Sequence, residues 1–194
     1  MEIRVAVIGA GSWGTTVASL VAANAPTTVW AREVDVAAEI DRDHTNSRYL
    51  PGFTLHPDLR STHSMAEAVG TADLIVMGVP SHGFRTTMEQ VAEHLRPWVP
   101  IVSLTKGLEQ STRMRMTQVV GEVVPGHPVG VLTGPNLAKE ILAGHAAAAV
   151  IAMSDVTVAT RLQDLFATEL FRVYTNEDVV GSELGGALKN VIAL

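Results

Sequence analysis

The sequence predicts an α/β fold with a doubly wound, mainly parallel sheet. Short apolar segments rich in Val and Ile alternate with segments of helical periodicity, a pattern typical of parallel strands joined by helices. The first apolar segment, Ile3–Ile8, lacks the polar alternation of a half-exposed strand and therefore indicates a strand buried on both faces. It leads directly into glycines spaced G-x-G-x-x-G and then into a helical pattern.

The glycines of this loop are Gly9, Gly11 and Gly14, and each has a physical role. Gly9 allows a tight turn, Gly11 lets the backbone approach a pyrophosphate, and Gly14 lets the helix lie close to the strand. The start of the helix adds free N–H groups and the positive end of its dipole. The motif alone is weak evidence, but its strand–turn–helix context favours a Rossmann-like dinucleotide site over a purely structural turn.

Turn and capping signals separate the elements of the first half of the chain. Pro51-Gly52 is a turn signal within the irregular stretch His44–Pro57, and Ser64 with Glu67 has the spacing of a capping box. The predicted elements are helix Trp13–Ala23, strand Thr27–Trp30, helix Glu33–Arg42, helix Ser64–Val69 and strand Leu74–Val79.

Prolines and glycines also mark the ends of elements in the second half. Pro97 stops one helix and Pro125-Gly126 ends another. We expect the dinucleotide-binding domain to cover residues 1–180, with residues 181–194 beginning a further helix. The predicted elements are helix His82–Leu95, strand Ile101–Leu104, helix Arg113–Val124, strand Val129–Thr133, helix Leu137–Leu142, strand Ala146–Met153, helix Val156–Phe166, strand Phe171–Tyr174 and helix Gly181–Leu194.

The composition limits the classes of partner. The net charge is −6 without a basic cluster, which argues against binding to nucleic acid or to an anionic membrane surface. There is no signal-peptide pattern, and no apolar run is long enough to span a bilayer, so we expect a cytoplasmic protein. Apolar residues make up 47% of the chain, and its 16 glycines bring the total above the usual 45–50%. This excess indicates either a large sheet buried on both faces or an apolar surface for a partner, for example in a homodimer.

Polar and glycine residues follow most of the predicted strands. They are expected to meet at one edge of the sheet, because ligands of such folds lie outside the carboxyl ends of the strands. Each group alone is more simply an ordinary turn, but together with the glycine loop they favour a binding site. These groups are Arg32, Pro80-Ser81, Lys106-Gly107 and Gly134-Pro135-Asn136.

Arg32 and Glu33 stand about where a residue that recognises the ribose belongs. Arg32 suits the 2′-phosphate of NADPH and slightly favours that cofactor, whereas Glu33 suits the free ribose hydroxyls of NADH. The alternative is a solvated pair of charges in a loop. Trp13 inside the glycine loop is unusual, because its large ring must either pack in the core or shield the cofactor.

Lys189 is the most informative residue of the last predicted helix. At helical spacing it shares one stripe with the small residues Ser182 and Gly186, which leave room for a ligand or for a closely packed helix. The alternative is a surface lysine on a packing helix. Glu109 and Glu140 are most simply solvated charges at helix ends.

Other common chemistries lack their signatures. The seven histidines show neither H-x-x-x-H nor H-E-x-x-H spacing and the chain has no cysteine, so no metal site is expected. No G-x-S-x-G motif supports a serine hydrolase.

Seven blocks of residues resemble NAD(P)-dependent glycerol-3-phosphate dehydrogenase of the bacterial type. They extend from one end of the chain to the other, and the combination of Trp in the glycine loop with KGLE and GALKN is specific among related dehydrogenases. The blocks are GAGSWGTTVA at Gly9–Ala18, W-x-R at Trp30–Arg32, NSRYLPG at Asn46–Gly52, VPSH at Val79–His82, SLTKGLE at Ser103–Glu109, GPNLAKE at Gly134–Glu140 and ELGGALKNVIAL at Glu183–Leu194.

The resemblance implies reversible reduction of dihydroxyacetone phosphate to sn-glycerol 3-phosphate with NADH or NADPH, which feeds glycerophospholipid synthesis. It implies Lys189 as the proton donor and Lys106 beside both cofactor and substrate. Further cofactor contacts, in addition to the glycine loop, are implied for Ser12, Trp13, Arg32, Tyr49 and Ala138. Further substrate contacts are implied for Gly134 and Asn136.

Two features depart from the family pattern. Asn136 and Leu137 stand where the family commonly has Ser and Phe, so the substrate contact keeps a polar group with altered geometry. The resemblance also implies a second, all-helical substrate domain after the last helix. It holds the substrate phosphate, and this chain lacks it. We therefore expect the present chain to bind cofactor and to be inactive alone.

Two alternatives remain open from the sequence. One is another Rossmann-type dehydrogenase, acting on a 2-hydroxyacid or a sugar nucleotide. The other is a non-catalytic NAD(H)-sensing module, in which Lys106 and Lys189 would be dispensable surface charges.

Overall fold

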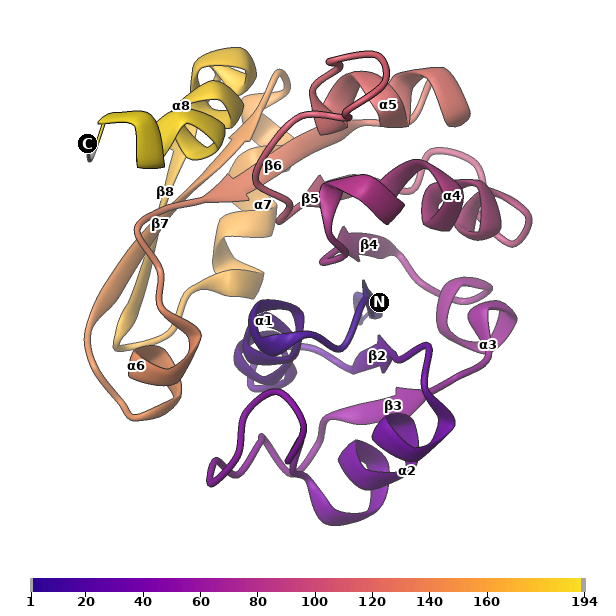
Figure 1. The fold of residues 1–194 in the computed structure, drawn as a ribbon, viewed down its shortest axis with the longest axis vertical. Coiled ribbons are helices and arrows are strands. Elements are labelled where there is room, and N and C mark those ends of the chain that lie inside the picture. Colours follow the sequence, from indigo (N-terminus) through magenta and orange to yellow (C-terminus); the bar gives the residue numbers. More distant parts are fainter. Residues whose placement is uncertain (1, 193–194) are drawn as a thin grey trace.

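The computed structural model describes residues 2–192 and confirms the α/β prediction. Helices alternate with strands along the chain (Figure 1). The strands are β1 (Val5–Ile8), β2 (Thr27–Trp30), β3 (Arg60–Thr62), β4 (Leu74–Met77), β5 (Ile101–Ser103), β6 (Val129–Thr133), β7 (Ala147–Met153) and β8 (Phe171–Asn176). The helices are α1 (Ser12–Ala22), α2 (Val34–Asp43), α3 (Met65–Val69), α4 (Ser81–Ala92), α5 (Met116–Val123), α6 (Ala138–Leu142), α7 (Val156–Phe166) and α8 (Val179–Ile192).

The strands form an eight-stranded sheet in the order β3-β2-β1-β4-β5-β6-β7-β8. Neighbouring strands are parallel except β6 and β7, which are antiparallel. The order turns back at β1 and continues outward through β4, so the sheet is doubly wound, as predicted. The change of direction after β1 creates the crevice in which such folds bind ligands.

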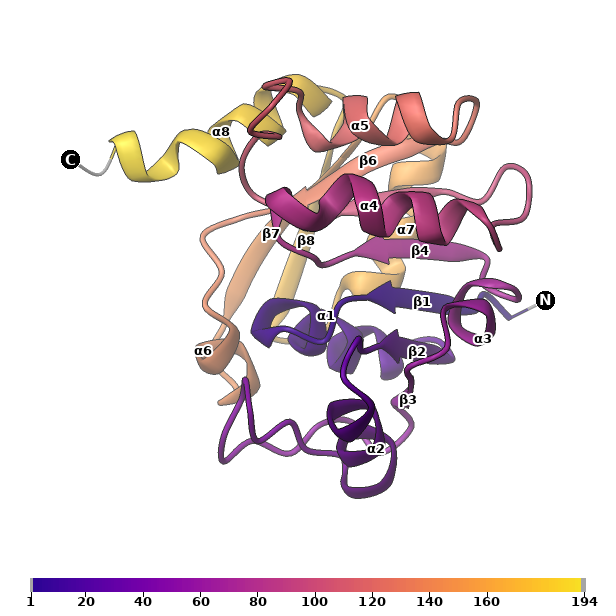
Figure 2. The ribbon, with the colours of Figure 1, turned by 45° about the vertical axis from the view of Figure 1, so that its right-hand side comes forward.

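Two apolar clusters cover the two faces of the sheet, and the side chains of the central strands β1, β4 and β5 alternate between them. On β1, Val5 and Val7 belong to the cluster that includes residues of α1, α2 and α7, whereas Ala6 and Ile8 belong to the cluster under α3, α4 and α5. Figure 2 shows α4 and α5 lying along the sheet. This alternation explains the continuous apolar runs of the central strands, because both faces of β1, β4 and β5 are buried.

The short edge strand β3 was not predicted. Its residues are polar, and only Thr62 is buried, so no apolar run marks it. It is held by its parallel pairing with β2 and by side-chain contacts of Ser61, whose N–H donates to Asp41 Oδ1 at 3.0 Å and whose hydroxyl donates to the Val29 carbonyl at 3.0 Å.

The predicted start of one helix was wrong. Helix α5 begins at Met116 and not at Arg113, because Arg113 has a positive φ of 59° and turns the chain before the helix. The segment before α5 is instead a loop that closes through an isolated bridge between Leu108 and Arg115.

The prediction for the start of α3 is confirmed in part. Ser64 is the N-cap, and its hydroxyl accepts a hydrogen bond from the Glu67 N–H at 3.3 Å. The Glu67 carboxylate does not return to the Ser64 backbone. It accepts from the Thr62 hydroxyl at 2.6 Å, and Thr62 in turn accepts from the Ser64 N–H at 3.1 Å. Thr62 therefore connects the two halves of the expected capping box.

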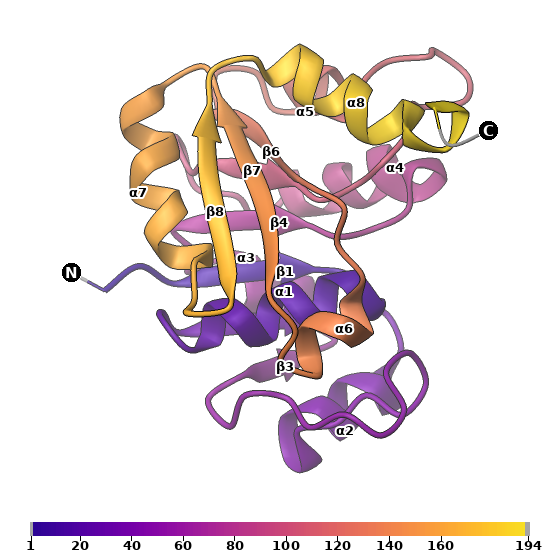
Figure 3. The same cartoon turned by 90° about the vertical axis from the view of Figure 1, so that its left-hand side faces the viewer.

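The last helix begins two residues earlier than predicted, at Val179. The Asp178 carboxylate accepts from the Gly181 N–H at 2.7 Å and so caps its first turn. The predicted end at Leu194 lies outside the described residues. Figure 3 shows α8 leading away from the end of β8, and its residues contact β6 and β7.

Candidate dinucleotide-binding site

A cavity of about 620 Å³ lies at the carboxyl ends of the central parallel strands. This volume is within the usual range for sites of small molecules and cofactors. Its walls are the glycine loop, the end of β2, the loops after β4 and β5, and Asn136. A second hollow, of about 530 Å³, lies at the amino ends of the strands, but the glycine loop does not contribute to it. The first cavity therefore matches the position predicted for the site.

The glycine loop has the geometry that a dinucleotide requires. Gly9 has a positive φ of 114°, and a Cβ there would lie 2.9 Å from the Gly78 carbonyl oxygen. A Cβ at Gly14 would clash with the carbonyl oxygen of Gly9, so this glycine allows the close contact of α1 with the strand. A Cβ at Gly11, in contrast, would meet no atom within 4 Å. Space is thus open above Gly11, where a pyrophosphate is expected.

The start of α1 provides donors for that anion. Its N-cap residue, Gly11, has no side chain to cap the first N–H groups, and its carbonyl accepts from Thr15 N–H at 2.9 Å. The backbone N–H groups of Ser12 and Trp13 lie in this first turn, next to the cavity. Uncapped N–H groups and the helix dipole attract phosphate, so these residues fit a dinucleotide.

Asn46 positions the loop that carries Tyr49, a role that the sequence reasoning missed. It is fully buried, and its Nδ2 donates to the Ala10 carbonyl and to the Thr15 hydroxyl, each at 2.9 Å. Its Oδ1 accepts from the Tyr49 N–H at 3.3 Å. The amide therefore attaches the second loop to the glycine loop and brings Tyr49 to the cavity wall. A buried polar residue in an irregular segment is the signal that could have identified it.

Arg32 and Glu33 both line the cavity, and they form an ion pair with each other at 2.8 Å. The Arg32 side chain is 80% exposed, whereas that of Glu33 is 25% exposed. The hydrogen bond from Arg32 lowers the pKa of the Glu33 carboxyl, which keeps it ionised. The two interpretations from the sequence are therefore linked, because the guanidinium that suits a 2′-phosphate is held by the carboxylate that suits a ribose.

Trp13 packs against the core and also lines the cavity, and its shielding of a cofactor stays a prediction. Its ring contacts the core through an edge-to-face arrangement with Phe171, with the ring centroids 6.4 Å apart. It also lines the cavity. The ring thus connects the glycine loop to strand β8, which is far from it in the sequence.

Lys106 lies at the end of the cavity farther along the sheet. Its ammonium donates to the Gly134 carbonyl at 2.9 Å, which places the two predicted substrate residues together. Burial lowers the pKa of the Lys106 amine, and the positive charge of Lys189 lowers it further. The two predicted lysines therefore lie close enough for their charges to interact.

Helix α8 brings Lys189 into this region. A Cβ on Gly186 would lie 2.7 Å from the Thr133 hydroxyl and 4.0 Å from Lys106 Cγ, so α8 is in close contact with the end of β6. Lys189 is exposed and does not belong to the cavity wall. The small residues expected around the lysine thus serve close helix packing.

Asn136 presents unpaired polar atoms at the cavity wall. Its Nδ2 and Oδ1 are both buried without a hydrogen-bond partner, and the residue lines the cavity. Buried polar atoms are normally paired, so these atoms suit hydrogen bonds to a polar group of a ligand in the cavity. Ala138, in contrast, is partly buried against the core cluster and does not line the cavity. Its contact with a cofactor stays a prediction.

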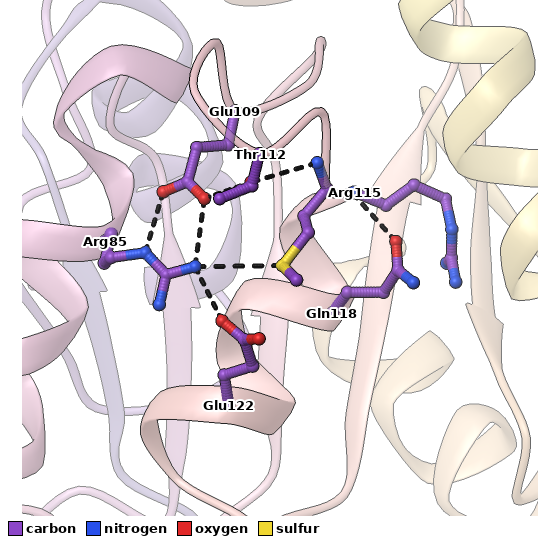
Figure 4. A network of polar contacts seen from close by, with 7 residues as sticks. Arg85, Glu109, Thr112, Arg115, Gln118 and Glu122 are labelled. Carbon is purple, nitrogen blue, oxygen red and sulfur yellow. Dashed lines mark hydrogen bonds and ion pairs between the residues drawn. The ribbon is translucent and has the colours of Figure 1, made fainter.

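The expectation that Glu109 is a solvated charge was wrong. Its carboxylate accepts hydrogen bonds from Arg85 Nε at 2.8 Å and from Arg85 Nη2 at 2.9 Å. It also accepts one from the Thr112 hydroxyl (Figure 4). Arg85 also donates to Glu122 at 2.8 Å. Hydrogen bonds from Arg85 lower the pKa of Glu109 to about 2. Glu109 follows Lys106 by three residues, so this network holds the loop that carries the lysine. Glu140 is exposed, as expected.

Two further searches concern metal ions and membranes. Within residues 2–192, no group of three or more His, Cys, Asp or Glu side chains could hold a metal ion. Over the same residues, no helix has the length and apolar character needed to cross a membrane.

The fold and the cavity define a Rossmann-type dinucleotide-binding domain. The family described as NAD-dependent glycerol-3-phosphate dehydrogenase N-terminus matches residues 4–159. The chain belongs to this family, and named relatives are similar to it over its whole length.

Two relatives show the extent of this similarity. A protein of Sphingopyxis alaskensis named glycerol-3-phosphate dehydrogenase (NAD(P)+) 2 is 57% identical over 194 residues, which are 100% of this chain and 58% of the relative. A protein of Mycobacterium avium named glycerol-3-phosphate dehydrogenase (NAD(P)+) is 58% identical over 100% of this chain and 57% of its own length. The chain thus spans less than two thirds of the length of these relatives.

Solved structures agree with the fold. The crystal structure of glycerol-3-phosphate dehydrogenase from Coxiella burnetii superposes with a TM-score of 0.92 at 29% identity, covering 99% of this chain and 59% of that one. A UDP-glucose dehydrogenase of Pyrobaculum islandicum superposes with a TM-score of 0.73 at 18% identity, covering 99% of this chain and 50% of that one. The second likeness shows the fold alone.

Proposed function

We propose that this chain binds NAD or NADP and forms the cofactor-binding part of a dehydrogenase that reduces dihydroxyacetone phosphate to sn-glycerol 3-phosphate. The arrangement that carries the proposal is a glycine-loop cavity lined at its far end by Lys106, with helix α8, which carries Lys189, packed beside that lysine. The names of relatives that are 57% and 58% identical support both the reaction and the cofactor. In a cell, the product would enter glycerophospholipid synthesis, and the protein would act in the cytoplasm.

The residues at the end of the cavity suit the reduction of a ketone. When bound, NADH or NADPH would supply a hydride to the carbonyl carbon, and negative charge would then develop on the carbonyl oxygen. Lys106 holds a positive charge beside that oxygen, and Lys189 donates the proton that completes the alcohol. Asn136 offers an amide for hydrogen bonds to the substrate. Lys106 lines the end of the cavity away from Arg32 and Tyr49, which suit the adenosine half of the cofactor.

We propose the same division of the chain as the sequence predicts. Residues 1–180 form the dinucleotide-binding domain, and residues 181–194 begin the helix that links it to an all-helical substrate domain of the family. The chain is 58% of the length of one relative, which is consistent with a substrate domain supplied by the remainder. A phosphate held there would position the carbonyl, so the 194 residues alone would bind cofactor without appreciable turnover. We also propose that the enzyme is a homodimer.

Two measurements test this function. Fluorescence titration of the 194-residue chain with NADH and NADPH measures cofactor binding, and absorbance at the nicotinamide band measures reduction of dihydroxyacetone phosphate by a polypeptide extended to the length of the relatives. We expect binding in the first and turnover in the second. Binding without turnover by the extended polypeptide would favour a sensing module. Turnover of a 2-hydroxyacid or a sugar nucleotide instead would show that the substrate is wrong.

A further inference from the structure

Glu183 is a buried carboxylate on α8 that the proposed reaction does not use. The residue is only 8% exposed. Its Oε1 accepts from the Thr117 N–H at 3.0 Å, and its Oε2 accepts from Arg115 Nη1 at 2.6 Å and from the Thr117 hydroxyl. A buried carboxylate is costly unless its oxygens are satisfied, and here three donors surround it.

These donors come from the start of α5 and from the loop before it. Thr117 lies in the first turn of α5, where its free N–H would otherwise lack a partner, so the carboxylate from α8 caps this helix. Arg115 ends the loop that begins just after Lys106 and contains Glu109. One carboxylate therefore joins α8 to the segment that carries the first lysine.

The same helix carries the second lysine a short distance further on. Lys189 follows Glu183 by six residues, which is about 9 Å along a helix axis. Between them, Gly186 lies against Thr133 with no room for a Cβ. The polar contacts of Glu183 and the close approach at Gly186 thus fix the rotation and the depth of α8. Beyond Gly186, Leu188 and Lys189 are exposed, so the sheet does not enclose that end of the helix.

We infer that Glu183 is a positioning residue that holds α8 so that Lys189 lies beside Lys106 at the end of the cavity. The inference rests on the proposed function, because it gives the position of Lys189 a catalytic purpose. An apolar side chain at position 183 could also be buried there. It would not, however, define the rotation of α8, because it would lack the three directed hydrogen bonds of the carboxylate. Errors of about 1 Å in placing a reacting group cost about 100-fold in rate.

The first test follows the distance between the lysines without any need for turnover. The chain has three lysines, Lys106, Lys139 and Lys189, so isotopically labelled methyl groups on their amines give few NMR signals to titrate. In Glu183→Gln, α8 loses its ionic contact and Lys189 moves away. We therefore expect the pKa of Lys106 to rise. Lys189→Gln removes the charge of Lys189 itself, so it gives the largest rise in the pKa of Lys106 that the loss of this charge can cause. Glu177→Gln changes an exposed carboxylate just before α8 and should leave the titration unchanged.

The second test uses the extended polypeptide, assayed well below its melting temperature and normalised to cofactor-binding sites. Glu183→Gln should lower kcat by about 100-fold, with the Kd for NADH changed less than twofold. Glu183→Asp, which keeps the charge on a shorter side chain, should recover part of the rate. If Glu183→Gln does not fold, Arg115→Gln removes one of the three donors and should give a smaller loss of the same kind.

The outcomes separate this inference from the function on which it rests. If the unaltered extended polypeptide neither binds NADH nor reduces the ketone, the proposed function is wrong. If it does both, and Glu183→Gln retains normal kcat and an unchanged Lys106 titration, then Glu183 only stabilises the fold and the inference fails. A fall in melting temperature with normal turnover per cofactor site would contradict it in the same way.

Discussion

At the scale of single residues, some groups of the cavity wall are held by hydrogen bonds within the protein, and others have unpaired polar atoms. Lys106 is held by the Gly134 carbonyl, and Tyr49 by Asn46, whereas both polar atoms of the Asn136 side chain are buried and unpaired. The paired groups shape the wall of the cavity, and the unpaired amide marks a position at which a ligand would form hydrogen bonds.

Gly11→Val should abolish dinucleotide binding while the protein stays folded. The φ of Gly11 is −69°, which valine adopts easily, and the space beside it is open, so the substitution fits the fold. The branched side chain would instead occupy the space of the pyrophosphate. Titration of NADH fluorescence measures the effect. Gly121→Val, on the exposed side of α5, is the matched control and should bind normally. Unchanged affinity in Gly11→Val would place the cofactor elsewhere.

Glu109 should make the stability depend on pH under acidic conditions. Its pKa falls from 4.5 to about 2 in the folded protein, so the unfolded state binds the proton more readily. The contribution is therefore complete above about pH 4.5 and is lost as the pH falls toward 2. Glu109→Gln should lower the free energy of unfolding at pH 7 by about 1–3 kcal/mol and flatten its slope over this range. Urea denaturation at several pH values measures both.

The control for Glu109 is Glu140→Gln, which alters an exposed carboxylate on α6. It should change the free energy of unfolding by less than about 0.5 kcal/mol, because exposed charges contribute little. Equal effects of the two substitutions would mean that the Arg85 network does not stabilise the fold.

At the scale of elements, the contact of α1 with β1 depends on the absence of a side chain at Gly14. Gly14→Ala would place a methyl group against the carbonyl of Gly9, so α1 would have to move away from the sheet. We expect a loss of about 1–3 kcal/mol in the free energy of unfolding. Gly11→Ala, three residues earlier in open space, should be nearly neutral. Thermal denaturation of both variants would compare them, and equal melting temperatures would contradict the proposed packing.

Most elements could be predicted from the sequence because burial on both faces leaves a continuous apolar signal. Strands β1 and β4 are of this kind. Strand β3 could not, because its three residues are polar and its stability comes from pairing with β2. The start of α5 was also predicted wrongly, because the hydrophobic pattern of the sequence does not reveal the positive φ of Arg113.

The candidate site was predictable to a similar degree. The glycine loop and the residues after the strands were found, because the carboxyl ends of parallel strands meet at one edge. The roles of Asn46, Glu109 and Glu183 were not, because each depends on partners brought near by tertiary structure. A polar residue has no periodic signal that distinguishes a buried network from a solvated surface.

At the scale of the whole molecule, a bound dinucleotide should stabilise both halves of the sheet together. The cavity is lined by the glycine loop, by the ends of strands on either side of β1, and by Asn136 after β6. A ligand that binds only the folded state stabilises it by about 2.7 kcal/mol at 100 times its Kd. For a chain of this size, this corresponds to a rise of roughly 5–10 °C in melting temperature. Differential scanning fluorimetry with NADH measures it, and Gly11→Val should show no rise.

The antiparallel pairing of β6 with β7 has a consequence for chain length. Strands β7 and β8 run opposite to β6. The chain therefore leaves β8 on the side of the sheet where the parallel strands begin, away from the cavity at their carboxyl ends. To bring Lys189 back toward the cavity, α8 must run along the length of β6. Its 14 residues span about 21 Å, and the five residues of β6 span about 17 Å. The length of helix α8 therefore sets how far Lys189 reaches toward the cavity. Deleting one turn before Lys189 would withdraw the lysine by about 5.4 Å, although no residue of the cavity would have changed.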